Sequence, residues 1–167
     1  MSALSLPNPL SCPLPETASG VSGKRYYIRE GRFTLRSAIW DHTAKDAPFS
    51  NEGIGLDWFS FEFDKPDACT FRFMEDGRET ALEAGLDGVA RLNSYYLRNT
   101  PLDKVLLHGA WTGKDTFSLG ARWIETCFSI TAVFKFNNKS VEISLKHIWG
   151  DYQSHPLREG NAVGMKD

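Results

Sequence analysis

One stretch near the middle of the chain brings together side chains of the kinds that catalyse reactions. The sequence HGAWTGKDTFSLG, residues 108–120, contains His108, Lys114 and Asp115, which are a potential base, cation and carboxylate. His108 alternates with apolar neighbours, which predicts that it faces outward from a strand. The polar letters TGKD predict a hairpin turn whose glycine adopts positive φ and whose lysine and aspartate are solvated. The pattern favours the corner of a sheet over a catalytic loop.

Two other patterns are compatible with metal binding or nucleophilic catalysis. His147, Asp151 and His155 are spaced by four residues, as three metal ligands on one helix face would be. A glycine and a proline in and after this stretch disfavour the helix, so no metal site is predicted. Ser22 lies in the sequence GVSGK, which leads into a strand rather than into the helix of a nucleophile elbow. No lysine has a serine three positions before it, so the Ser-x-x-Lys pair of penicillin-recognising enzymes is missing from the sequence.

A group of acidic residues gathers along the stretch from 62 to 83. Two carboxylates at a set separation across a cleft hydrolyse glycosides, and a single carboxylate or histidine can act as a base. Strand alternation places Glu62 on the solvent face, so a solvated acidic face is predicted instead. A small enzyme with His147 or one of these acids as its base is the least favoured hypothesis. The acidic group includes Glu62, Asp64, Glu75, Asp76, Glu79 and Glu83.

Most of the chain has apolar residues with a period of two, which predicts strands that position these side chains. The dipeptide Asp76-Gly77 between two alternating runs is a strong hairpin pattern. No segment has sustained helical periodicity. About eight to ten strands joined by short turns predict an all-β fold, an antiparallel meander closed into a lipocalin-like β-barrel, with a flattened sandwich as the alternative. The predicted strands span residues 24–29, 32–40, 55–63, 68–75, 78–84, 89–96, 105–111, 116–120, 125–136 and 140–148.

Aromatic side chains on the inner faces of these strands are the feature that most favours a binding function. Aromatic residues make up 13% of the chain, and they alternate along several strands. They are predicted to pack as a solid core, with Trp111 at one end of the barrel; the alternative is an apolar pocket for a small ligand. The predicted lining of such a pocket is Phe59, Phe61, Phe71, Phe73, Trp111, Phe128, Phe134 and His147.

Composition excludes several classes of partner. A net charge of −2 and the lack of any Lys/Arg run argue against nucleic acid and against a membrane surface. Three cysteines, Cys12, Cys69 and Cys127, are too few and too scattered for a disulfide framework, so reduced thiols are predicted. No cofactor is predicted. The sequence contains no convincing signal peptide or membrane span, which predicts a cytoplasmic location.

Three regions follow from the patterning. Residues 1–21 are rich in proline and serine and are interpreted as a linker or tail, which suggests a further segment upstream. Residues 22–150 are predicted to form the β-barrel domain. Residues 151–167 are interpreted as a C-terminal tail.

The strand and turn sequences resemble a known family. The string LLHGAWTGKDTFSL, followed later by FSITAVFKFNNKSVEISLK, resembles the end of the C-terminal lipocalin-like β-barrel domain of penicillin-binding-protein and β-lactamase-related serine hydrolases. SGKRYYIRE resembles the opening of that domain, and GLDGVARL its central element. The resemblance extends from Ser22 to Lys146.

This resemblance implies a non-catalytic accessory domain. The nucleophile would belong to a catalytic domain that precedes the linker, so no catalytic residue is carried onto any position of this sequence. The implied roles are packing on a serine-hydrolase domain, in the same chain or another, shaping of substrate access, or assembly of oligomers. The alternative hypothesis is a stand-alone lipocalin-like barrel that binds a small hydrophobic ligand.

Overall fold

The structure is a computed structural model that describes residues 14–31, 33–35, 55–96, 101–126, 129–147 and 161–166, with the backbone alone at 146, 147, 161 and 162. These residues form ten strands and one short helix. No helix within these ranges is long and apolar enough to cross a membrane. The elements are α1 Glu16–Val21, β1 Tyr26–Gly31, β2 Leu56–Glu62, β3 Ala68–Glu75, β4 Arg78–Gly85, β5 Arg91–Ser94, β6 Lys104–Trp111, β7 Thr116–Trp123, β8 Ser129–Phe136, β9 Ser140–His147 and β10 Asn161–Lys166.

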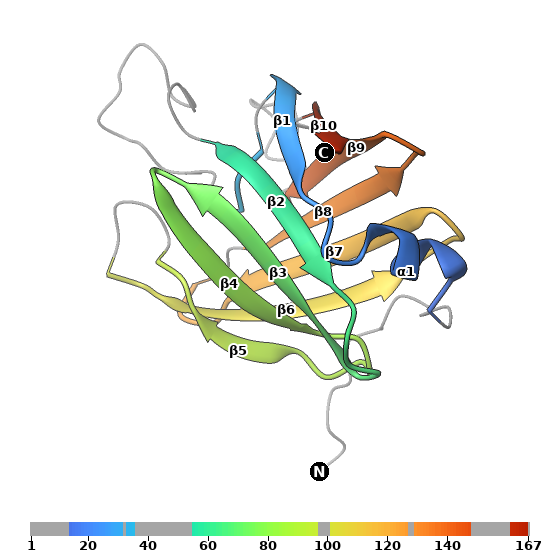
Figure 1. The fold of residues 1–167 in the computed structure, drawn as a ribbon. Helices are drawn as coiled ribbons and strands as arrows, with labels where there is room; N and C mark the ends of the chain where they lie inside the picture. Colours follow the sequence, from blue (N-terminus) through green and yellow to red (C-terminus); the bar gives the residue numbers. More distant parts are fainter. Residues whose placement is uncertain are drawn as a thin grey trace, which may run out of the picture.

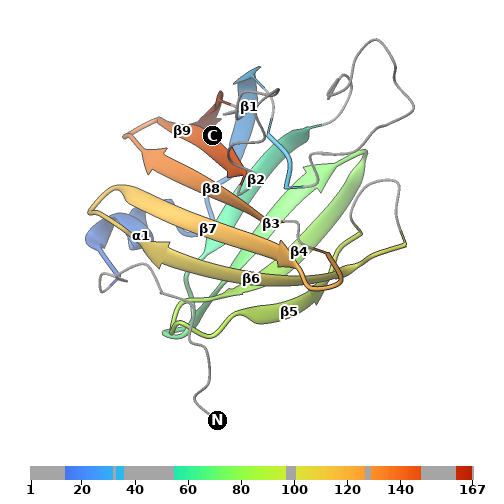
Figure 2. The same ribbon diagram turned by 180° about the vertical axis from the view of Figure 1, so that it is seen from behind.

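The strands form a single sheet that curls round and closes on itself (Figures 1 and 2). The first and last strands, β1 and β10, pair antiparallel. The ring is completed where β4 runs parallel to β6, with Gly85 opposite His108, so that nine strands form the barrel and β5 lies beside β6. The prediction of an all-β barrel is confirmed. The parallel contact departs from a pure meander because the short β5 leaves β4 facing β6.

The turn between β3 and β4 has the backbone that its sequence predicts. Asp76 and Gly77 both have positive φ, at 53° and 70°. Two successive residues of this kind form the hairpin turn whose twist matches that of the flanking strands. All eight residues of β3 pair with β4 as a result.

The junction between β4 and β5 is made by a side chain. The Oδ1 atom of Asn93 accepts a hydrogen bond from the backbone N–H of Glu83 at 2.8 Å, and its Nδ2 atom donates to the carbonyl oxygen of Glu83 at 2.9 Å. The backbone of β5 meanwhile pairs with β6. The Asn93 amide therefore gives the edge of β4 the two hydrogen bonds that a neighbouring strand would provide.

Arg91 holds the turn that leads from β4 to β5. Its guanidinium lies 3.1 Å from a carboxylate oxygen of Asp67 and 3.1 Å from one of Asp87, and it donates to the carbonyl oxygen of Val89 at 2.6 Å. The hydrogen bond from Arg91 lowers the pKa of Asp87 below its usual value. Gly85 is required here because the Val89 carbonyl occupies the place of a Cβ.

The ends of the described chain contribute to the barrel. Residues 16–21, within the predicted linker, form α1, which lies beside the β6–β7 turn in Figures 1 and 2. Residues 161–166, within the predicted C-terminal tail, form β10, which pairs with both β1 and β9. Gly164 allows this pairing, because a Cβ there would lie 2.8 Å from Val141 and 3.2 Å from Tyr26.

Three local predictions are wrong. Residues 33–35, predicted within a strand, lie between strands. The long strand predicted over 125–136 is shorter, because β8 begins at Ser129. Gly113 does not have positive φ, and the β6–β7 turn closes with a hydrogen bond from Thr112 N to Thr116 O at 2.9 Å.

Candidate functional site

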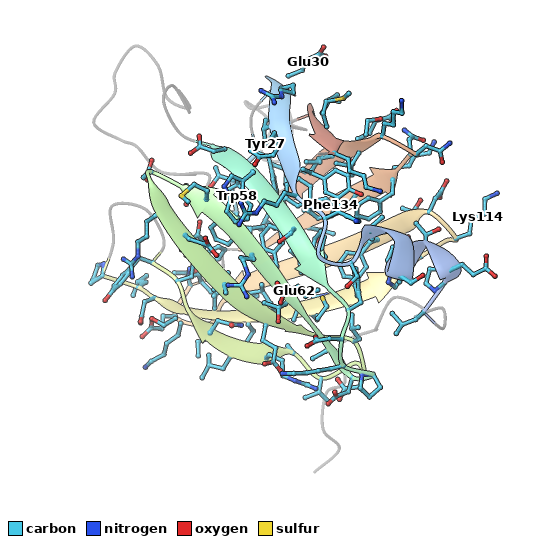
Figure 3. All side chains as sticks on the ribbon, in the orientation of Figure 1. Tyr27, Glu30, Trp58, Glu62, Lys114 and Phe134 are labelled. Carbon is cyan, nitrogen blue, oxygen red and sulfur yellow. The ribbon has the colours of Figure 1, made fainter. Side chains whose placement is uncertain are left out.

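The barrel interior is lined by phenylalanine rings that alternate along facing strands. Phe59 and Phe61 on β2, Phe71 on β3 and Phe134 on β8 are each 0% exposed. Phe61 lies 4.9 Å from Phe71 and 4.9 Å from Phe134 between ring centroids. Figure 3 shows Phe134 within the barrel, whereas Tyr27, Trp58 and Glu62 lie on its outer face. The period of two thus places the phenylalanine rings of β2 and β8 inward and the side chains that alternate with them outward.

The interior ring of Phe33 comes from outside the strands. Residues 33–35, here called the inner segment, are buried inside the barrel between β1 and β2. The Phe33 ring is 0% exposed and lies 6.1, 6.3 and 5.5 Å from the rings of Phe59, Phe71 and Phe134. The carbonyl oxygen of Phe33 accepts a hydrogen bond from Leu56 N at 2.8 Å. The inner segment therefore occupies space that the strands surround.

A buried carboxylate holds the inner segment. Glu75, the last residue of β3, is 3% exposed and points inward in register with Phe73. It accepts hydrogen bonds from the Thr34 hydroxyl at 2.5 Å and from the Tyr95 hydroxyl at 2.6 Å. The prediction that Glu75 belongs to a solvated acidic face is wrong, because these hydroxyls replace water around its oxygens.

The opposite end of the barrel contains a buried indole. Trp111, the last residue of β6, is 1% exposed and lies beside Phe63, Phe117 and Phe136, with centroids 5.4, 5.3 and 5.8 Å away. Among the described residues, its Nε1 atom is the one buried side-chain polar atom without a hydrogen-bond partner. An unpaired donor in apolar surroundings costs about 1–3 kcal/mol.

The structure brings most of the predicted pocket lining together. Six of the eight residues line one continuous interior cluster and are at most 1% exposed. Phe128 and the side chain of His147 lie outside the described residues. The six are Phe59, Phe61, Phe71, Phe73, Trp111 and Phe134.

The residues considered for catalysis are dispersed. Lys114 is exposed and points away from the barrel at the tip of the β6–β7 turn (Figure 3). The His108 ring packs over Gly120 on the outer face, and burial lowers its pKa below the usual value. The Ser22 hydroxyl oxygen accepts a hydrogen bond from Phe63 N at 2.9 Å. Asp151 and His155 lie outside the described residues.

The described ranges contain no group of three His, Cys, Asp or Glu side chains able to hold a metal ion. Of the three cysteines, Cys69 is described: it is a free thiol on the inner face of β3. Burial, followed by the charges of Glu83 and Asp64, raises the pKa of Cys69 to about 12. The thiol therefore stays protonated and packs as a small apolar group.

Several interior residues do not follow from the sequence pattern. The pattern predicts Phe33 within a strand, and it predicts no inward position for Thr34 or Glu75. Tyr95 and Trp123 were missed because their contact is non-local: Trp123 Nε1 donates to the Tyr95 carbonyl oxygen at 2.9 Å across the barrel end. Leu119, Ala121 and Trp123 occupy alternate positions along β7, and this alternation predicts that Trp123 faces inward.

A scan against protein-family profiles finds no match, and a search of curated protein sequences finds none. Solved structures do match. A Schistosoma mansoni fatty acid binding protein in complex with arachidonic acid is 9% identical with a TM-score of 0.60, covering 90% of this chain and 98% of that one. As-p18, an extracellular fatty acid binding protein, is 11% identical with a TM-score of 0.60, covering 93% and 100%. A Drosophila melanogaster brain fatty acid-binding protein is 12% identical with a TM-score of 0.55, covering 87% and 98%.

These neighbours overturn the resemblance to the barrel domain of β-lactamase-related serine hydrolases. The expected accessory role is therefore wrong, and nothing supports the expected serine-hydrolase partner. The strings that carried the resemblance form β1 and the residues before it, the β4–β5 turn, the β6–β7 hairpin and the β8–β9 hairpin. Strand-and-turn patterns of this kind are set by barrel geometry, which unrelated families share. The chain has the fold of the fatty-acid-binding protein barrels.

Proposed function

We propose that this protein binds a small hydrophobic ligand inside the barrel, and that its role is binding rather than catalysis. The observation that carries the proposal is the interior itself: a closed barrel whose inner face is a continuous cluster of aromatic and aliphatic side chains. The neighbours in fold, one described in complex with arachidonic acid, support it. The proposed lining remains Phe59, Phe61, Phe71, Phe73, Trp111 and Phe134, with Phe128 and His147 as predictions from sequence.

The inner segment occupies the place that a ligand would take. Its Phe33 ring contacts three strand rings, yet residues 33–35 belong to no strand. Moving the Phe33 ring therefore breaks no pairing between strands, whereas moving Phe59 or Phe134 would disrupt the sheet. We propose that the ligand displaces the Phe33 ring and packs against the same rings.

A titration with an uncharged fluorescent probe tests this function. N-phenyl-1-naphthylamine fluoresces strongly once it leaves water, and we expect saturable binding at one site per chain. Alkan-2-ones of increasing length should displace it, each added methylene tightening binding about fourfold, since burial of one contributes about 0.8 kcal/mol. A lack of saturation, or displacement that does not depend on chain length, would contradict an interior site.

The fold does not fix the cellular compartment. One neighbour in fold is described as extracellular, so a cytoplasmic location stays a prediction from the sequence. The free, buried Cys69 is compatible with a reducing compartment.

A further inference from the structure

The indole N–H of Trp111 is the feature of the interior that the fold leaves unused. Trp111 is 1% exposed and surrounded by the rings of Phe63, Phe117 and Phe136. No acceptor lies within hydrogen-bonding distance of its Nε1 atom in the part of the chain that the structure describes. Most buried polar groups in proteins are paired, so a donor of this kind calls for a specific explanation.

The other fully buried indole, that of Trp123, does have a hydrogen-bond partner. Trp123 is 0% exposed, and its Nε1 atom donates to the carbonyl oxygen of Tyr95 at 2.9 Å. Both tryptophans therefore have a fully enclosed indole, and only Trp111 lacks an acceptor from the described protein. The difference points to an acceptor that another molecule supplies.

The two ends of the interior differ in polarity. Tyr95 lies near the start of β6, where its backbone N–H bonds to Asp103 O, and it binds the Glu75 carboxylate. Trp111 is the last residue of β6, at the other end. A hydrogen-bond acceptor is attracted by the Trp111 donor, whose N–H has no partner among the described residues. An acceptor group would therefore lie at the Trp111 end.

A continuous row of rings leads from Trp111 into the site proposed above. Trp111 contacts Phe117 at 5.3 Å, Phe117 contacts Phe61 at 5.0 Å, and Phe61 contacts Phe134 at 4.9 Å. A ligand with one polar end can lay its apolar part along this row.

The charge of the polar end is also constrained. Among the described residues, the buried polar or charged side chains are Thr34, Ser60 and Glu75, and none of them is a cation. A ligand carboxylate at the Trp111 end would meet no cation from these residues, and a single indole N–H does not replace its hydration. The interior thus favours an uncharged acceptor.

We propose that Trp111 anchors the ligand by donating a hydrogen bond to an uncharged acceptor, such as a ketone, aldehyde or ester oxygen, at one end of an otherwise apolar molecule. The proposal rests on the proposed function, and it adds the chemical class and the orientation of the ligand: acceptor towards Trp111 and chain towards Phe134.

Three ten-carbon probes test it: decan-2-one, decanoate and decane, each competing with N-phenyl-1-naphthylamine. The native chain should bind decan-2-one more tightly than decanoate. Trp111→Phe keeps an aromatic ring and removes the donor, so the affinity for decan-2-one should fall about 3- to 10-fold while that for decane stays within about twofold. Trp123→Phe is the matched control, and it should leave the ratio of the affinities for decan-2-one and decane unchanged.

An NMR measurement on the native chain gives a readout that does not depend on the folding of a variant. The indole N–H resonance of Trp111 is assigned from its nuclear Overhauser effects to the rings of Phe63, Phe117 and Phe136, and decan-2-one should shift its proton downfield whereas decane should not. If Trp111→Phe binds decan-2-one as tightly as the native chain does, the anchor is overturned; a buried water that already pairs with the indole N–H would give this result. An indole resonance that decan-2-one does not shift would overturn it as well. Tighter binding of decanoate would overturn the uncharged class. If the native chain binds neither decane nor decan-2-one, the proposed function itself is wrong.

Discussion

Phe33 meets Phe134 edge to face inside the barrel, with ring centroids 5.5 Å apart and planes at 84°. Phe134 is fixed on β8 between two paired strands, whereas Phe33 belongs to the inner segment outside the strands. The contact therefore joins a rigid wall to a separable part of the chain. It marks Phe33 as the ring whose place a ligand can take without disturbing the sheet.

Replacement of Phe33 by alanine should tighten ligand binding while it destabilises the free protein. The cavity left behind lowers the free energy of unfolding by about 3–5 kcal/mol. The ligand no longer has to displace a buried ring, so N-phenyl-1-naphthylamine should bind at least about tenfold more tightly. Urea unfolding and fluorescence titration measure the two effects.

Trp58→Ala is the control that shows whether a loss of stability by itself changes probe affinity. Trp58 packs on the outer face beneath the Arg25 guanidinium, 4.3 Å from its ring centroid. Its loss should destabilise the fold and leave probe affinity unchanged. Unaltered or weaker binding by Phe33→Ala would contradict the assignment of the site.

Replacement of Glu75 by alanine should cost about 3 kcal/mol of unfolding free energy, because the Thr34 and Tyr95 hydroxyls both lose a buried acceptor. Urea unfolding gives the value. Glu79→Ala on the next strand is the matched control: Glu79 is exposed and pairs with Arg72 at 3.4 Å, so its loss should change stability by less than about 0.5 kcal/mol. Equal effects of the two variants would show that the Glu75 hydrogen bonds do not stabilise the inner segment.

Asn93→Ala should lower the free energy of unfolding by about 1–2 kcal/mol, because the backbone N–H and C=O of Glu83 lose their partners at the β4–β5 junction. Hydrogen exchange at the Glu83 amide should accelerate locally. The neighbouring Ser94→Ala removes one exposed hydrogen bond to Asp103 and should be nearly neutral. A neutral Asn93→Ala would mean that water replaces the amide without loss.

The stability of the protein should fall as the pH is lowered through and below 6.5, the ordinary pKa of histidine, partly because of His108. Burial lowers the pKa of His108 in the folded chain, so below 6.5 the unfolded chain takes up a proton that the folded chain does not. Its contribution is therefore fully favourable above 6.5 and is lost towards acid. The melting temperature of His108→Gln should vary less over this range than that of the native chain, and parallel pH profiles would rule out the contribution.

Local patterns predicted much of this fold. The Asp76-Gly77 turn, the alternation in β3 and β6, and the inward Phe59, Phe61 and Phe134 depend on neighbours in sequence, and such features can be inferred from periodicity. The features that were missed depend on distant partners. β10 is a strand because β1 and β9 flank it, and its Gly164 weakens the local pattern.

The same distinction applies to the site. Glu75 has the sequence of a turn residue, and its burial depends on distant partners, among them Thr34 and Tyr95, 41 and 20 positions away. Phe33 alternates with Leu35 as a strand residue would, yet it lies inside a barrel that the other strands close. The unpaired Trp111 donor follows from the packing of three rings from separate elements.

Nuclear Overhauser effects between ¹³C-labelled dodecan-2-one and the protein show where in the molecule a hydrophobic ligand binds. For a ligand inside the barrel, we expect contacts from its chain to the ring protons of Phe59 and Phe134. We expect none to Trp58 on the outer face. Contacts confined to outer-face residues such as Leu92, or no contacts at saturating ligand, would contradict binding inside the barrel.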